Sequence, residues 1–172
     1  DLSIEKRVSI TPESAKNIIN LGISVFVEKN YATHIGIKDE EYEGVGVGIK
    51  NTSKDILNNC SLLTKVNCPS DNEILNLKDK SILVGMLNPS KNQNKLKQIL
   101  RKNINIFSLE LLPRISRAQS MDVLSSQSNL AGYRSVIDSI YEFEKAVPMM
   151  MTAAGTVPAA KVLVIGAGVA GL

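Results

Sequence analysis

The chain has 172 residues, of which 44% are apolar, enough to build a packed core, and its net charge of +3 is too small to indicate a nucleic-acid-binding protein. No apolar run reaches the ~18 residues of a membrane-spanning helix, and the opening residues lack the basic start and apolar stretch of a signal peptide. Cys60 and Cys68 match no metal or redox spacing. We therefore expect a soluble chain with free thiols and no metal site.

Strands and helices are predicted to alternate over the first 110 residues. Thr11 is a typical N-cap, Pro12 suits the first helical position, and Gly22 closes this helix. Apolar runs predict strands at 23–27, 61–66, 81–85 and 104–108. Helices are predicted between them at about 39–44, 71–77 and 91–102. This order predicts one doubly wound domain with a mostly parallel sheet, which binds ligands at the carboxyl ends of its strands.

The basic run in the last of these helices has no interleaved aromatic residues. A solvated helix face therefore explains it better than a nucleic-acid surface does. Nucleic acid is not an expected partner.

The segment from Arg114 to Arg134 is unusually polar for a strand-to-helix connection. Because it follows the strand at 104–108, we expect it at the carboxyl edge of the sheet. Its guanidinium, amide, carboxylate and hydroxyl groups would suit a bound carboxamide and ribose. The alternative is an ordinary capping loop, in which Asp122, Ser125 and Ser126 satisfy helix amides. The residues alone leave both interpretations open.

A long helix is predicted from about Ser126 to Lys145, before Pro148. We predict an α/β fold of two Rossmann-like parallel-sheet domains, the second only begun in this chain. Residues 1–125 would form an incomplete first domain, 126–147 a linking helix, and 148–172 the start of the second domain. The linking helix could act as a hinge or as plain scaffold.

The last residues run from the apolar stretch Val162–Ile165 into Gly-x-Gly-x-x-Gly, with glycines at 166, 168 and 171. A buried strand that turns sharply into a helix has this pattern. The first glycine permits the turn, the second lets backbone approach a pyrophosphate, and the third lets the helix pack on the strand. Such turns also serve as packing devices, but the preceding strand favours dinucleotide binding. The acidic residue that would hold a ribose falls beyond Leu172.

Three segments, at 5–13, 114–134 and 148–158, resemble the alanine dehydrogenase/nicotinamide nucleotide transhydrogenase family. The stretches Arg117–Arg134 and Pro148–Leu172 closely resemble the NAD(H)-binding domain of proton-translocating transhydrogenases. The resemblance covers essentially the whole chain. It implies two Rossmann-like domains with the NAD cleft between them, and a first domain that further segments at both ends of this sequence would complete.

The resemblance also implies roles for single residues. Gln119 would hydrogen-bond near the nicotinamide and its ribose, and Arg114 and Asp122, paired with each other, would flank the carboxamide. Ser125 would bond the same carboxamide. These groups would orient the ring and would not transfer protons. Orientation is what hydride transfer requires of a protein. The pyrophosphate of NAD(H) would be held by Gly166, Gly168 and Gly171.

The alanine dehydrogenase branch needs more than NAD. This chain resembles it in Arg7 and Lys65, which in that branch grip the substrate carboxylate and carbonyl. That branch also uses an acid/base histidine just after the strand at 81–85, where this chain has Asn88. The only histidine, His34, suits a surface or structural role. This departure favours the transhydrogenase branch, with Arg7 and Lys65 as inherited architecture in ion pairs.

The resemblance thus implies one component of a Re/Si-specific, proton-translocating transhydrogenase that passes hydride between NADH and NADP+. NADP(H) would bind a partner domain, and a separate membrane domain would move the proton. We expect a homodimer and a soluble domain at the membrane face, on the bacterial cytoplasmic or mitochondrial matrix side. The alternatives are an alanine dehydrogenase-like NAD oxidoreductase and a non-catalytic folding or dimerisation module.

Overall fold

The structure is a computed structural model that describes residues 5–172, and the chain divides into two compact units, Asp1–Leu112 and Pro113–Leu172. Residues 1–4, where the predicted first domain begins, lie outside the described residues. The first unit alternates helices with parallel strands, so the predicted α/β class is confirmed. The domain boundaries placed after residues 125 and 147 stay predictions.

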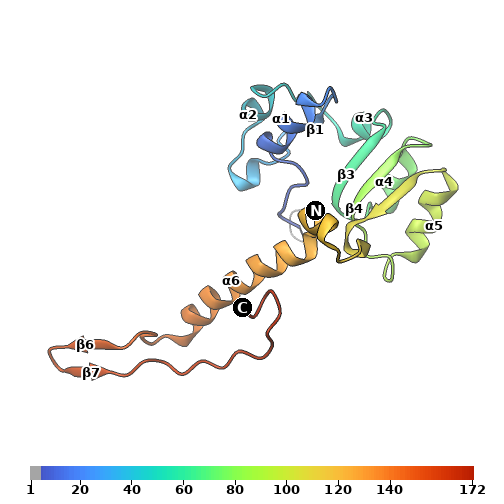
Figure 1. The fold of residues 1–172 in the computed structure, drawn as a ribbon. Helices are drawn as coiled ribbons and strands as arrows, with labels where there is room; N and C mark the ends of the chain where they lie inside the picture. Colours follow the sequence, from blue (N-terminus) through green and yellow to red (C-terminus); the bar gives the residue numbers. More distant parts are fainter. Residues whose placement is uncertain (1–4) are drawn as a thin grey trace. The chain divides into compact units, whose positions relative to one another are not determined.

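The first unit contains most of the regular structure (Figure 1). In chain order its helices and strands are α1 (Pro12–Asn20), β1 (Phe26–Glu28), η1 (Thr33–Ile35), α2 (Asp39–Glu43), β2 (Gly48–Lys50), α3 (Ser53–Leu57), β3 (Leu62–Asn67), α4 (Asp71–Asn76), β4 (Ile82–Met86), α5 (Gln93–Arg101), β5 (Asn105–Ser108) and η2 (Leu109–Leu111). All the predicted elements of this unit are present, although β1 begins three residues later than expected. Besides the 3₁₀ turns η1 and η2, the elements β2 and α3 were not predicted, because each is too short to show a periodic pattern.

The strands form two parallel sheets instead of the single expected sheet. β3, β4 and β5 pair in that order, with α4 and α5 as the crossover helices, while β1 pairs with β2 (Figure 1). Leu63, Leu83 and Ile106 are register partners across the larger sheet, so they share one face. This face packs against Ile74 of α4 and Ile99 of α5. Because Leu83 and Ile99 are almost fully buried, each contributes roughly 2–3 kcal/mol of apolar burial.

Local capping explains where the helices begin. The Thr11 hydroxyl accepts a hydrogen bond from the Ser14 N–H at 3.3 Å, which confirms the predicted N-cap of α1. α4 begins with a capping box, in which the Ser70 hydroxyl accepts from the Glu73 N–H at 3.3 Å. In return the Glu73 carboxylate accepts from the Ser70 N–H at 2.8 Å. α4 therefore starts at the carboxyl end of β3, and Glu73 is held next to that strand end.

The second unit consists of a short 3₁₀ segment, a long helix and an extended C-terminal stretch. η3 (Ser116–Met121) leads into α6 (Val123–Phe143), so the long helix starts and ends earlier than predicted. It ends at Glu144, whose φ of 52° lies in the left-handed region, four residues before Pro148. None of the described helices combines the length and hydropathy needed to cross a bilayer.

Two features of the second unit differ from the sequence-based prediction. β6 (Met150–Thr152) and β7 (Gly155–Val157) form an unpredicted antiparallel hairpin. The predicted strand at 162–165 is not formed, and residues 168–171 make turns instead of a helix. A strand forms only where a neighbouring strand supplies its hydrogen bonds, and neither described strand of this unit pairs with the run at 162–165. The apolar run at 162–165 therefore has the composition of a strand but no backbone hydrogen bonds to a neighbouring strand.

Candidate functional site

The polar loop of the second unit is organised around the start of α6. Asp122 is the N-cap of this helix: its carboxylate accepts hydrogen bonds from the Ser125 N–H at 2.9 Å and from the Ser125 hydroxyl at 2.6 Å. These two bonds, with a smaller effect of the Arg114 charge, lower the pKa of Asp122 below its usual range. The carboxylate is therefore ionised and fixed in orientation at neutral pH.

The other predicted residues of this loop lie on or beside η3. Gln119 is exposed, and its backbone carbonyl oxygen accepts a hydrogen bond from the Asp122 N–H at 3.3 Å. Ala118 anchors η3 as a buried side chain. Arg114 is exposed and acts on Asp122 through its charge, but these two described side chains make no ion pair within 4.0 Å. The expected Arg114–Asp122 pairing is thus a longer-range interaction in this structure.

The predicted capping alternative is partly realised in the same loop. Asp122 satisfies a helix amide, as that alternative requires. The hydroxyls of Ser125 and Ser126 behave differently, since they donate to the Asp122 carboxylate and to the Val123 carbonyl oxygen. Capping and ligand orientation are compatible roles for Asp122, because a carboxylate has more acceptor positions than these two bonds use.

The three glycines of the Gly-x-Gly-x-x-Gly motif lie in one turn. The carbonyl oxygen of Gly168 accepts from the Gly171 N–H at 2.9 Å and from the Leu172 N–H at 3.1 Å. Gly166 has φ of 115°, a conformation that residues with a Cβ rarely adopt. A Cβ on Gly171 would strike the Gly166 carbonyl, whereas a Cβ on Gly168 would meet open space. The turn therefore needs two of its glycines for its own shape and leaves backbone exposed at the third.

The first unit holds Arg7 and Lys65 in ion pairs, as predicted for inherited architecture. The Arg7 guanidinium donates to both carboxylate oxygens of Glu5, at 2.8 and 2.7 Å. This hydrogen bonding lowers the pKa of Glu5 to about 2, and the Asn67 amide adds a bond at 3.0 Å. Lys65 pairs with Glu73. Both cations are thus neutralised by carboxylates of the chain itself.

The environment of Glu73 balances opposing effects. Burial, the largest influence, would raise the pKa of Glu73, but hydrogen bonds from Lys65 and Ser70 and the Lys65 charge together lower it.

His34 also has a structural role, since its Nε2 lies 2.8 Å from the Lys6 carbonyl oxygen. Within the described residues, no group of three or more His, Cys, Asp or Glu side chains could hold a metal ion.

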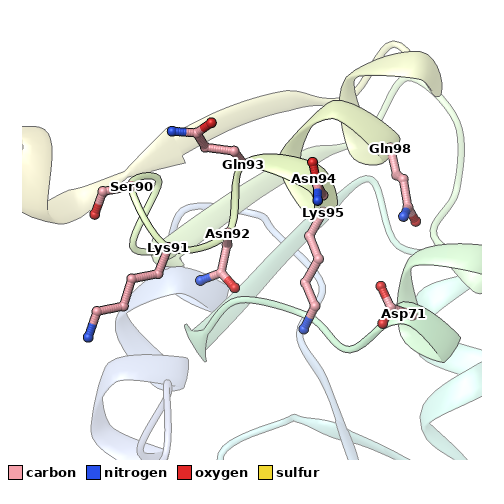
Figure 2. Close-up of a pocket in the computed structure, with 8 residues that line it drawn as sticks. All are labelled: Asp71, Ser90, Lys91, Asn92, Gln93, Asn94, Lys95 and Gln98. Atoms are coloured by element: carbon pink, nitrogen blue, oxygen red, sulfur yellow. The ribbon is translucent and has the colours of Figure 1, made fainter.

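A shallow pocket of about 500 Å³ lies elsewhere on the first unit. Figure 2 shows its eight lining residues, which are Asp71, Ser90, Lys91, Asn92, Gln93, Asn94, Lys95 and Gln98. None of the predicted site residues is among them. The side chains of Lys91 and Lys95 end well apart in this view, so they do not converge on one point (Figure 2). The pocket is therefore distinct from the loop at the start of α6 and from the glycine turn.

Parallel strands joined by crossover helices, with a Gly-x-Gly-x-x-Gly turn near the end, define a Rossmann-like α/β protein. The family model for the alanine dehydrogenase/PNT N-terminal domain matches residues 2–131, and that for the C-terminal domain matches residues 135–172. The chain belongs to the alanine dehydrogenase/PNT family, as its motifs indicated.

Among curated relatives, the first part of NAD(P) transhydrogenase subunit alpha of Rickettsia prowazekii is 46% identical, over 98% of this chain and 45% of the relative. The protein of the same name from Rhodospirillum rubrum is 45% identical over the same shares. An alanine dehydrogenase of Methanococcus maripaludis is 29% identical, over 97% of this chain and 45% of that protein. The chain thus spans about half the length of the curated relatives it matches.

A solved structure of the transhydrogenase from Sinorhizobium meliloti superposes with a TM-score of 0.92 at 46% identity. It is matched over 97% of this chain and 50% of that one. A structure of L-alanine dehydrogenase superposes with a TM-score of 0.80 at 24% identity, which shows a shared fold only.

Proposed function

We propose that this chain belongs to the NAD(H)-binding component of an NAD(P) transhydrogenase. The observation that carries the proposal is the difference in similarity between the two branches of the family. The transhydrogenase alpha subunits of Rickettsia prowazekii and Rhodospirillum rubrum are 45–46% identical to this chain, whereas the alanine dehydrogenase of Methanococcus maripaludis is 29% identical. The absence of a histidine at Asn88 supports the same branch.

In this proposal NAD(H) is a substrate that the chain binds and orients. The backbone of Gly166, Gly168 and Gly171 holds the pyrophosphate, with backbone N–H groups of the turn as the donors. Gln119, Arg114, Asp122 and Ser125 orient the carboxamide and ribose of the nicotinamide end. Hydride leaves the dihydronicotinamide of NADH, which becomes NAD+, and joins the nicotinamide of NADP+, which becomes NADPH. None of these side chains needs to gain or lose a proton in this step.

The remaining features of the proposal concern the whole protein. NADP(H) binds a partner domain, and proton translocation with Re/Si stereospecificity belongs to the assembled enzyme with its membrane domain. The component works as a homodimer at the membrane face, on the bacterial cytoplasmic or mitochondrial matrix side. The names of the relatives support a multi-subunit enzyme, because they designate a subunit alpha.

The second candidate is an alanine dehydrogenase-like oxidoreductase, which the shared fold favours. Two observations count against it. Arg7 and Lys65, the cations suited to a substrate carboxylate, are already paired with Glu5 and Glu73. His34 is the only histidine, and it contacts the Lys6 carbonyl group. A substrate carboxylate would have to displace these internal partners, and no imidazole follows β4 to act as the base.

We therefore expect the full-length protein, assembled with its partner domains, to transfer hydride from NADH to NADP+ and not to oxidise alanine with NAD+. Both reactions are followed by nucleotide absorbance on the same preparation. Alanine-dependent reduction of NAD+ at about 1 s⁻¹ or more, as for a typical enzyme, would move the chain to the other branch. A non-catalytic module would show neither reaction and no NADH binding.

A further inference from the structure

Gly132 is the only glycine of the 21-residue helix α6. A glycine in a helix interior is less favourable than alanine, because its backbone loses more freedom on folding. The neighbouring side chains of Ala131 and Tyr133 are exposed, whereas Gly132 is half-buried. Something therefore covers α6 at Gly132, between two exposed neighbours.

The covering group is the backbone of Ala170, which lies inside the Gly-x-Gly-x-x-Gly turn. A Cβ on Gly132 would strike the Ala170 carbonyl oxygen and would lie 3.0 Å from its carbonyl carbon and 3.1 Å from its Cα. These are backbone atoms, so they cannot swing away as the end of a flexible side chain can. A Cβ on Gly168 in the same turn would meet nothing within 4 Å. The tight contact between α6 and the turn thus lies at Gly132 and Ala170.

The same helix carries the two groups at the other end of the candidate site. Asp122 caps α6, and Ser125 lies in its first turn. Gly132 follows Val123 by nine positions, which corresponds to ~14 Å along the axis at ~1.5 Å per residue. α6 therefore links the pyrophosphate turn to the nicotinamide loop as one rigid spacer, with Gly132 as the contact point on the pyrophosphate side.

We propose that Gly132 is a positioning residue, which sets the distance between the pyrophosphate turn and the nicotinamide loop by letting the Ala170 backbone lie directly on α6. This inference rests on the proposed function and goes further, because it assigns a role to a residue outside both the turn and the loop. A methyl group at Gly132 has to push the turn outward. A ligand that contacts both the pyrophosphate turn and the nicotinamide loop then loses its contacts with one of the two. A ligand held by the turn alone moves with the turn and keeps its contacts.

The test uses Gly132→Ala in the full-length protein, with NADH and ADP as probes. NADH spans both ends, and ADP carries only the adenosine and pyrophosphate parts. We expect the dissociation constant of NADH to rise about tenfold, because an extra methyl in a packed contact forces the backbone to shift, and that of ADP to change less than about twofold. Single-turnover hydride transfer should slow as well. The matched control is Ala131→Ser, which adds one atom at the exposed neighbouring position and should leave all three values unchanged.

The ratio of the two dissociation constants separates positioning from a packing role. Alanine is the better helix former, which offsets part of the strain at the contact, so the variant is expected to fold. An unchanged NADH-to-ADP ratio would overturn the inference, whether both affinities fall together or neither changes, and whatever happens to the melting temperature. If the unsubstituted protein itself binds no NADH, the proposed function fails, and that result is visible before any variant is made.

Discussion

Gln119→Asn is expected to slow hydride transfer about 100-fold while leaving NADH affinity nearly intact, since a small misplacement of a reacting ring can have an effect of this size. Gln119 has an exposed side chain and lies next to the Asp122 cap. Its backbone carbonyl oxygen accepts a hydrogen bond from the Asp122 N–H. The substitution keeps the amide but shortens its reach by one methylene. In the proposed function most of the binding energy comes from the adenosine and pyrophosphate groups at the glycine turn, so affinity is expected to be preserved.

Single-turnover rates, NADH titrations and melting temperatures on the same preparation measure this effect. Gln98→Asn is the matched control, because Gln98 is an exposed amide on α5 that is not assigned to the nucleotide. A capping loop without a role in nicotinamide binding gives the opposite pattern. A normal transfer rate in Gln119→Asn, accompanied by a lowered melting temperature, would end the orientation role of this residue.

Asp122→Asn and Asp122→Ala together separate the two roles of the Asp122 carboxylate. Asparagine is as good an N-cap as aspartate, so the asparagine variant should keep the melting temperature of the parent. It loses the negative charge near Arg114, and we expect hydride transfer to fall by one to two orders of magnitude, roughly 10- to 100-fold, through misplacement of the carboxamide. The alanine variant should lose the same activity and, in addition, about 1 kcal/mol of stability with the cap.

The control for the capping role is Thr11→Ala, which removes the hydroxyl that accepts from the Ser14 N–H at the start of α1. It should lower stability by a similar amount, about 1 kcal/mol, with hydride transfer unchanged. The orientation role of Asp122 is contradicted if the asparagine variant transfers hydride at the parental rate. In that case the carboxylate serves only as a helix cap.

Much of the first unit could be predicted from the sequence, because its signals are local. The Thr11–Pro12 start of α1 is a local signal, and so are the apolar runs of β3, β4 and β5. The short β2 could not be found, since three residues show no period. The run at 162–165 has the composition of a strand, but a strand exists only when a neighbour supplies its hydrogen bonds. The number of sheets is equally a matter of pairing, which no local pattern specifies.

The candidate site divides in the same way. The Asp122 cap and the glycine turn follow from short motifs, and the structure forms both. The ion pairs of Arg7 and Lys65 were expected from the missing histidine, although their partners Glu5 and Glu73 were not identified. Gly132 was missed entirely. A glycine inside a strongly helical segment is itself a signal of close backbone approach, but its partner, Ala170, lies 38 residues further along the chain.

The central claim is that this chain builds a site for NAD(H), and titration of the full-length protein with NADH and NADPH tests it most directly. The claim predicts saturable NADH binding that is clearly tighter than NADPH binding, with the nicotinamide end held by the loop at the start of α6. Tighter binding of NADPH, or no binding of NADH at all, would contradict it.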